Sequence, residues 1–394
     1  LNLLILGYFK YYNFFGENFA AFFRMLGWEV DWVTRDILLP VGISFYTFQA
    51  LSYTIDVYRR KMFPTHDVVA FFAFISFFPQ LVAGPIERAT YLLPQFLKPR
   101  VFSYAAAVDG MRQILWGLFK KMVVADNCAD AVNEIFANYQ TADGMQLFLG
   151  ALFFTFQIYG DFSGYSDIAI GTARLFGVDL MRNFSYPYFS RDIAEFWRRW
   201  HISLTTWFRD YIYIPLGGSR CARWKVMRNT AVIFLVSGFW HGANWTYVCW
   251  GAYHAMLFFP LLYFGKNRKH VDGVAEGRIL PTVKEALQML MTFLLVVLGW
   301  VIFRAETIGQ AWEYIARMFT HFTFRLPAHG NDPLIYIGIL LCVEWLQRGK
   351  QHGLQIGAGG WFKYRAVGWL LYSVAFIAPF LLSGQQEEFI YFQF

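Results

Sequence analysis

Long apolar runs separated by short polar and basic loops dominate the pattern of this chain. Eight runs are candidates for membrane-inserted helices: residues 1–15, 37–58, 68–83, 146–159, 230–264, 286–303, 333–345 and 366–382. A ninth apolar piece, residues 110–125, is interrupted by Lys120 and Lys121, which favours a re-entrant or interfacial helix. We therefore expect an all-α polytopic membrane protein with roughly nine to eleven inserted helices.

The run 230–264 is too long for one straight span. Residues 174–228, which precede it, carry ten basic and four acidic residues, and the loops 266–284 and 348–365 are also basic. Basic loops are typical of the cytoplasmic side of a membrane. The run should therefore leave and return on one side, with a break near Gly238, His241 and Gly242.

Composition supports lipid as the solvent. Hydrophobic residues make up 57% of the 394 positions and charged residues 15%, against about 25% charged in a soluble domain. The net charge of +7 arises from basic loops, with no basic tract of the nucleic-acid-binding kind. We expect no nucleic-acid partner.

The cysteines Cys128, Cys221, Cys249 and Cys342 show no paired spacing, and no H-x-x-x-H pattern occurs, so neither a disulfide framework nor a metal site is predicted. We interpret residues 1–394 as a single domain. The chain opens at Leu1 directly in an apolar run, and we expect an N-terminal span or two to precede it.

Residues 192–213 predict one amphipathic helix. Asp192 and Glu195 have the spacing of a capping box, and Glu195 and Arg199 form an i,i+4 pair. At 100° per residue the apolar stripe contains Trp197, Trp200, Leu204, Trp207, Phe208 and Tyr211, and the opposite face contains Arg198, Arg199 and Arg209. His201 lies on the border. Two interpretations stay open: an interfacial anchor, or the wall of a catalytic cavity.

His241 is the clearest candidate for chemistry. A helical arrangement would put it on one face with Ser237, Asn244 and Trp245. It is either a core histidine bonded to a neighbouring helix or an acid or base in a polar cavity. We favour the second, because ionisable groups at membrane depth are costly and imidazole suits proton transfer near neutrality.

The stretch "GDFSGYSD" (residues 160–167) holds two carboxylates, Asp161 and Asp167, beside two glycines. We predict that it breaks a helix and pins neighbouring backbone groups. A cation site between the carboxylates is the alternative.

Six stretches together resemble the membrane-bound O-acyltransferase family, specifically its bacterial alginate O-acetyltransferase branch, and more distantly the D-alanyl transfer protein of teichoic-acid modification. They are "LPVGISFYTFQALSYTIDVYR" (39–59), "FFPQLVAGPIER" (77–88), "FQIYGDFSGYSDIAIGTARLFG" (156–177), "FWRRWHISLTTWFRDYIYIPLGGSR" (196–220), "GFWHGANW" (238–245) and "FIYFQF" (389–394). They follow one another through nearly the whole chain.

The resemblance implies a ring of helices around a central tunnel and an acyl transfer. The family's hallmark histidine falls on His241, which would act as general base, with an acyl-histidine route less favoured. The second polar position falls on His201, expected at the cytoplasmic mouth and at another depth. Gly238 and Gly242 would leave room for a pantetheine arm. The remaining substrate-binding candidates are Trp240, Asn244 and Trp245 beside the imidazole, and Arg198, Arg199 and Arg209 at a basic mouth.

The donor implied is a cytoplasmic thioester, acetyl-coenzyme A or a phosphopantetheine carrier protein, with no tightly bound cofactor and no metal. The acceptor implied is a hydroxyl of an alginate- or cellulose-like exopolysaccharide or of a periplasmic acetyltransferase or relay protein. The setting is the bacterial inner membrane, crossed several times, with lipids as partners.

Two other classes stay open. A transporter should show paired intramembrane carboxylates or inverted repeats, and we find neither. A non-catalytic anchoring subunit of a polysaccharide-modification complex would not need His241.

Overall fold

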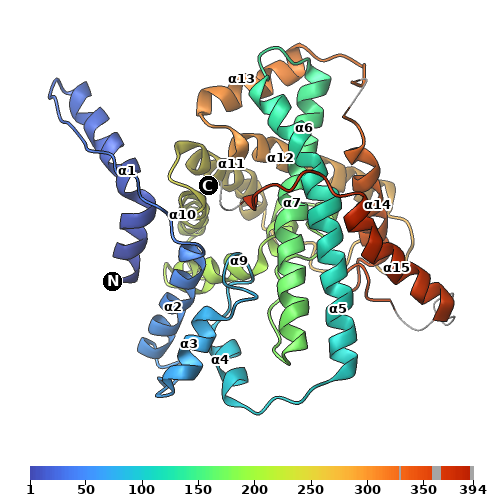
Figure 1. The fold of residues 1–394 in the computed structure, drawn as a ribbon. Helices are drawn as coiled ribbons and strands as arrows, with labels where there is room; N and C mark the ends of the chain where they lie inside the picture. Colours follow the sequence, from blue (N-terminus) through green and yellow to red (C-terminus); the bar gives the residue numbers. More distant parts are fainter. Residues whose placement is uncertain (328–329, 357–364, 391–394) are drawn as a thin grey trace.

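The computed structural model describes residues 1–327, 330–356 and 365–390, which form helices and no strands (Figure 1). The first half contains α1 (Asn2–Met25), α2 (Ile43–Tyr58), α3 (Val68–Ser76), α4 (Ala89–Leu97), α5 (Tyr104–Leu118), the π-helical η1 (Phe119–Ala125), α6 (Asp126–Ala137) and α7 (Gly144–Leu175). The second half contains the 3-10 turn η2 (Pro187–Phe189), α8 (Ile193–Arg199), α9 (Ile202–Phe208), the π-helical η3 (Arg209–Tyr213), α10 (Arg223–His241), α11 (Trp245–Tyr263), α12 (Val283–Arg304), α13 (Ile308–Thr320), α14 (Pro333–Leu346) and α15 (Arg365–Leu381). The predicted all-α class is therefore confirmed for these residues.

Most apolar runs coincide with helices, but their bounds differ. The run 1–15 continues as α1 to Met25, and the run 68–83 is helical only to Ser76. Part of the basic loop 348–365 and the last four residues of "FIYFQF" lie outside the described residues. The four cysteines are free thiols.

The helix α7 lies against α5 at the centre of the molecule, as the green and teal ribbons of Figure 1 show. Glycines let the two backbones touch: a Cβ on Gly117 would lie 2.6 Å from the carbonyl oxygen of Gly164, and one on Gly164 would lie 2.8 Å from that of Gly117. The predicted break at residues 160–167 is wrong, since α7 runs through them without interruption. Small residues four apart are also the signature of close helix packing. In this stretch the glycines allow α7 to pack closely on α5 and do not break the helix.

The carboxylates of that stretch are neutralised by the two lysines of η1. Lys120 Nζ lies 2.6 Å from Asp167, and Lys121 Nζ lies 2.9 Å from Asp161. Lys120 and Asp161 are almost fully buried, and a buried charge persists only when it is paired. The ammonium groups thus occupy the place that the alternative interpretation gave to a metal cation.

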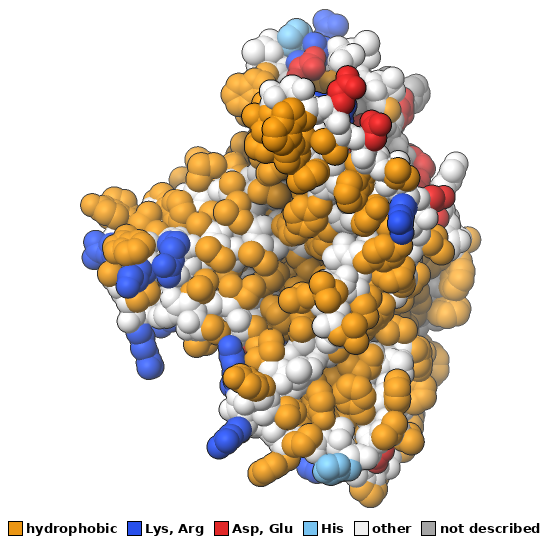
Figure 2. Space-filling model, turned by 90° about the vertical axis from the view of Figure 1, so that its left-hand side faces the viewer, with side chains coloured by type: hydrophobic (Ala, Val, Ile, Leu, Met, Phe, Trp, Pro, Cys, Tyr) orange, Lys and Arg blue, Asp and Glu red, His pale blue; other side chains and the backbone are white. Residues whose placement is uncertain are grey.

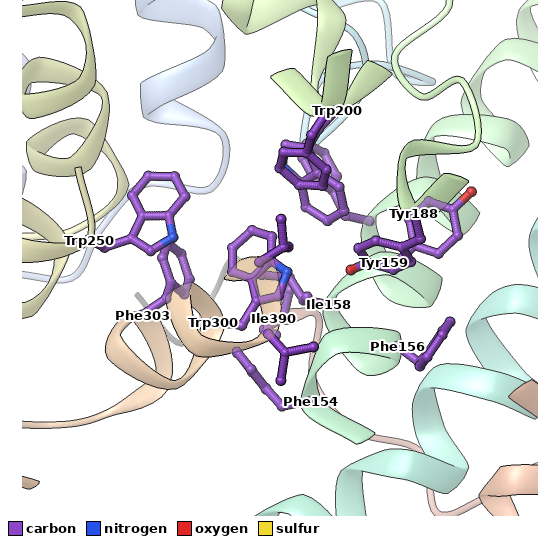
Figure 3. Packing of buried hydrophobic residues seen from close by; sticks show 14 of the residues in the cluster. Phe154, Phe156, Ile158, Tyr159, Tyr188, Trp200, Trp250, Trp300, Phe303 and Ile390 are labelled. Carbon is purple, nitrogen blue, oxygen red and sulfur yellow. The ribbon is translucent and has the colours of Figure 1, made fainter. Parts of the chain in front are cut away.

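An aromatic core joins α7, α8, α11 and α12. Trp250 and Phe303 lie side by side in Figure 3, and Trp300 and Tyr159 face the same interior. The rings of Trp250 and Trp300 stack at 5.8 Å, and both side chains are buried. Large rigid rings of this kind bury much surface at little conformational cost, so the core around them is well fixed.

The long run 230–264 forms a hairpin, and its predicted break is confirmed. The helix α10 ends at His241 and α11 begins at Trp245. A Cβ on Gly238 would collide with the carbonyl of Tyr247, and one on Gly242 with the Tyr247 ring. These glycines therefore allow α10 to approach α11, and the room expected for a pantetheine arm is filled by Tyr247.

Hydrophobic side chains cover much of the face seen in Figure 2, while acidic side chains gather toward its top and several Lys and Arg side chains project from its lower half. By length and apolar content, α12 is the one described helix that qualifies as a membrane span. The expected nine to eleven inserted helices and the ring around a tunnel stay predictions.

Candidate functional site

His241 is the last residue of α10, and its side chain is buried, with 7% of the residue exposed. Three helices supply the walls around its imidazole: Trp240 from α10 at 5.0 Å between ring centroids, Trp250 from α11 at 5.3 Å and Phe303 from α12 at 5.4 Å. The last two rings meet the imidazole edge to face, at 89° and 77°. An imidazole held this way has little freedom to rotate.

The end of α10 is capped by α1, a contact that the sequence analysis missed. Lys10 Nζ donates hydrogen bonds to the carbonyls of Trp240 at 2.8 Å and His241 at 2.9 Å. Tyr11 donates to the carbonyl of Phe239 at 2.9 Å, and its ring stacks on Phe239 at 4.3 Å. The last carbonyls of a helix lack partners within the helix, and a cation there also suits the helix dipole. A lysine within an apolar run was the available signal.

His201 lies at a break that the sequence analysis did not predict. The expected continuous helix 192–213 is wrong: α8 ends at Arg199, α9 begins at Ile202, and His201 between them is left-handed, with φ 44° and ψ 54°. The predicted N-cap is present, since Asp192 accepts a hydrogen bond from the Glu195 backbone at 2.7 Å. Because each break rotates the following helix, the periodic pattern could not place this side chain.

The cytoplasmic side expected for His201 stays a prediction, but its side chain does not open to solvent. His201 is 1% exposed. Its ring centroid lies 6.3 Å from that of Trp240, which in turn lies 5.0 Å from that of His241. The structure thus brings the two predicted histidines together in one aromatic cluster, with the Trp240 indole as a neighbour of both.

Asn183 fixes the His201 ring. Its side-chain oxygen lies 3.0 Å from His201 Nδ1 and also accepts hydrogen bonds from the Ser203 backbone N–H at 3.3 Å and the Ser203 hydroxyl at 3.0 Å. Within the described ranges, His201 Nε2 has no hydrogen-bond partner. Asn183 precedes His201 by eighteen residues across a turn, and no pattern in the sequence indicates this pairing.

Two predicted partners of the imidazole have other roles. The side chain of Asn244 caps α11 by accepting from the Thr246 backbone at 3.1 Å and donates to the Glu306 carbonyl at 3.0 Å. Trp245 is 52% exposed, and its indole donates to Asn18 of α1 at 2.9 Å. Both side chains hold helices around the break in the hairpin. Of the three predicted neighbours of His241 in this stretch, Trp240 is the one that packs on its ring.

A cavity of about 450 Å³ opens between α8, α9 and α10. Its wall includes Ile202, the neighbour of His201, and Ser237, which lies four residues before His241. Most of the exposed surface of this lining is apolar. It comes from Ala194, Trp197, Leu204, Phe208, Ile233, Phe234, Phe258 and Leu262, and polar and basic residues complete the wall.

The three predicted arginines differ in their surroundings. Arg198 and Arg209 line this cavity. Arg198 donates to the carbonyls of Asn267 at 2.8 Å and His270 at 2.6 Å, whereas Arg209 bonds its neighbour Asp210 at 2.8 Å and keeps 57% of its side chain exposed. Arg199 is held by Glu195 at 2.6 Å, which confirms the predicted i,i+4 pair. Arg209 is therefore the one of the three with an accessible charge at the cavity.

The loop between α11 and α12 covers α8 through ionic contacts. Arg191 lies 3.3 Å from Asp272 and 3.1 Å from Glu195. Hydrogen bonds from Arg191 lower the pKa of the Asp272 carboxyl, and burial lowers the pKa of His270 in the same loop. These contacts fix one side of the cavity near neutral pH.

Comparisons with known proteins match the region that holds both histidines. The sequence model of the membrane-bound O-acyltransferase family matches residues 60–299. The chain is 44% identical over 326 residues to the probable alginate O-acetylase of Pseudomonas aeruginosa, covering 83% of this chain and 60% of that protein. It is 31% identical over 441 residues to the peptidoglycan O-acetyltransferase of Helicobacter pylori, covering 100% and 81%.

A more distant relative is the teichoic acid D-alanyltransferase of Bacillus subtilis, with 28% identity over 288 residues covering 69% of this chain and 70% of that protein. The chain spans about 60% of the length of the alginate O-acetylases that it matches. By their names, these relatives act on different polymers, namely alginate, peptidoglycan and teichoic acid.

Proposed function

The chain belongs to the membrane-bound O-acyltransferase family, and we propose that it moves an acyl group, an acetyl group in the first instance, from a thioester to a hydroxyl. Proteins of this family are membrane proteins, so lipid is the solvent of its apolar faces. The observation that carries the proposal is the pairing of two buried imidazoles, His241 and His201, around the Trp240 indole. We take residues 1–394 as one domain for this purpose.

In the proposed reaction the acceptor hydroxyl attacks the thioester carbonyl carbon. His241 removes the hydroxyl proton as the C–O bond forms, and the proton then passes to the sulfur as the C–S bond breaks. Thioester and alcohol thus give ester and thiol, with no net proton change and no redox step. A positioned general base contributes typically 10²–10⁴ in rate.

The donor in this proposal is acetyl-coenzyme A or an acyl phosphopantetheine carrier protein. The cavity of about 450 Å³, whose lining includes Ile202 and Ser237, supports it, because it is largely apolar and carries arginines. An elongated pantetheine arm suits such a lining, and a guanidinium pairs readily with phosphate. Arg209, whose side chain is the more exposed, is the residue we assign to the phosphate.

The acceptor in this proposal is a hydroxyl outside the cytoplasm, on an alginate-like exopolysaccharide or on a periplasmic acetyltransferase or relay protein. The basic loops support a cytoplasmic donor side. The proposal also places the chain in the bacterial inner membrane, crossed several times by roughly nine to eleven inserted helices arranged around a tunnel. The name of the alginate O-acetylase relatives favours alginate as the first acceptor to test.

The test uses membrane vesicles containing the full-length protein, radiolabelled acetyl-coenzyme A and alginate, with O-acetyl ester formation as the readout. His241→Ala should lose about 10²–10⁴ in rate. His254→Ala is a matched control: His254 is also a buried histidine of the hairpin, and its ring also lies beside Trp250, at 5.0 Å.

His254→Ala should keep most of the acetyl transfer. If His241→Ala retained it as well, the chain would be an anchoring subunit and the proposal would be wrong.

A further inference from the structure

Asn183 makes an unusual set of contacts for a fully buried amide. Its side-chain oxygen meets three donors, His201 Nδ1, the Ser203 backbone and the Ser203 hydroxyl, while its side-chain nitrogen donates to Ser166 at 3.2 Å. Its backbone carbonyl accepts from the Ile202 N–H at 2.9 Å. One residue between α7 and η2 therefore holds both the ring and the following backbone of His201.

These contacts determine which nitrogen of His201 carries the proton. The Ser203 backbone N–H is a donor, so the amide atom that it meets is the oxygen and not the nitrogen. An amide oxygen only accepts, and His201 Nδ1 must therefore be protonated to bond it. In the neutral ring, Nε2 then carries a lone pair.

The backbone conformation of His201 also indicates that the surrounding structure holds this residue in place. A left-handed conformation such as φ 44° and ψ 54° is uncommon for a residue with a side chain. Such residues persist when their surroundings hold them and are found preferentially at functional sites. Here Phe162 faces the ring edge on at 4.6 Å and 86°, and Asn183 holds its Nδ1 side.

The other ring nitrogen of His201 has a different environment. His201 Nε2 is buried and, among the described residues, has no hydrogen-bond partner. The Trp240 indole N–H is in the same condition, and the two rings lie 6.3 Å apart. Buried polar atoms are usually bonded, and a donor on a bound group would supply the partner that Nε2 lacks.

We propose that Asn183 is a positioning residue that holds His201 as the Nδ1–H tautomer, so that Nε2 accepts a hydrogen bond from an O–H or N–H group of the bound substrates. This inference rests on the proposed function. His201 contacts substrate in this arrangement, whereas Asn183 acts through His201 and makes no contact with substrate itself.

The tautomer of His201 should affect activity without affecting folding. A ring with the opposite tautomer carries an N–H at Nε2. It then has no acceptor for the substrate's donor group, and the hydrogen bond is lost. A protonated ring does the same. Activity should therefore depend on the acceptor at Nδ1 and on whatever favours the imidazolium, which gives two independent readouts.

The experiment compares Asn183→Leu and Asn183→Asp in the acetyl-coenzyme A and alginate assay. Asn183→Leu removes the acceptor and should lower kcat by on the order of 100-fold, the scale of a misplaced reacting group, with the KM for acetyl-coenzyme A nearly unchanged. Asn183→Asp is isosteric and keeps an oxygen at Nδ1, and the Ser166 hydroxyl can turn to donate to the second oxygen. A carboxylate there favours the imidazolium, so the acid limb of the kcat–pH profile should move up by about one unit.

Ser166→Ala is the matched control, because it removes the partner on the far side of the same amide and leaves the bond to His201. It should lower thermal stability slightly and leave the pH profile in place. Wild-type kcat in Asn183→Leu, or an active Asn183→Asp with an unshifted acid limb, would overturn the inference. Where Asn183→Leu does not fold, the isosteric variant decides alone.

His241→Ala in the same assay separates this inference from the function on which it rests. Retained activity in His241→Ala removes the proposed function. Loss of activity in His241→Ala together with normal Asn183 variants removes only the role of Asn183.

Discussion

Lys10 offers the most direct way to loosen His241 without touching its ring. Its ammonium bonds the carbonyls of Trp240 and His241, and methionine keeps a stem of similar length but removes both bonds. A hydrogen bond to a charged group contributes about 1.5–3 kcal/mol. Lys10 is only partly buried and one ammonium serves both carbonyls, so we expect less than two full bonds, about 2 kcal/mol for the pair.

That free energy sets the size of the effect on the reaction. Because 1.4 kcal/mol is a factor of ten, a loss of about 2 kcal/mol lowers the population of the docked helix end by as much as about 30-fold. If only the docked end presents His241 correctly, kcat for acetyl transfer falls by up to that factor. The KM for acetyl-coenzyme A should change little, since Lys10 and the rest of α1 do not line the cavity.

Three further variants make the Lys10→Met measurement specific. Lys10→Arg keeps a charged donor and should recover much of kcat. Tyr11→Phe removes only the neutral hydrogen bond to the Phe239 carbonyl and keeps the ring stacking, so it should lower kcat only a few-fold. Arg24→Met removes a charge from the same helix α1, where that side chain bonds only its own helix among the described residues, and should leave kcat unchanged. A wild-type kcat in Lys10→Met would refute the reasoning.

The other predictions use the ionic contacts of the cavity and the core. Arg209→Glu should raise the KM for acetyl-coenzyme A with normal expression, and the increase should shrink at high salt; an unchanged KM would exclude Arg209 from the donor site. Arg198→Glu should instead lower the melting temperature in thermal-shift assays, because it removes the hydrogen bonds that Arg198 donates to the carbonyls of Asn267 and His270. Lys120→Met should lower the free energy of unfolding by about 3–5 kcal/mol, because it leaves the Asp167 carboxylate without its cation. Adding Asp167→Asn should recover stability. No recovery would contradict the ion-pair account.

The sequence predicted the break in the α10–α11 hairpin because two physical constraints coincide there. A run too long for one span, with basic loops on both sides, must turn within the membrane, and the turn falls at the polar residues near His241. The break at His201 has no such cause in the pattern. It follows from hydrogen bonds to Asn183, and contacts between distant segments leave no periodic signal.

The misread stretch at residues 160–167 has a different reason. Glycine favours both turns and close helix packing, and the choice depends on what lies opposite. Here Gly117 of α5 faces Gly164 of α7, and the lysines of η1 reach the two carboxylates. The composition of one segment could not reveal that its partner was another glycine-bearing helix.

The two histidines are held by different means, and this predicts different signatures when each support fails. His241 is held through its backbone, since Lys10 binds the carbonyls at the end of α10, and aromatic rings from three helices pack around its imidazole. Loosening this end by Tyr11→Phe, which leaves the Lys10 charge in place, should lower kcat equally at every pH. His201 is held through its ring by Asn183, which also fixes the tautomer, so failure there should depend on pH. A shifted pH profile in Tyr11→Phe would show that the two supports are coupled through the Trp240 indole between them.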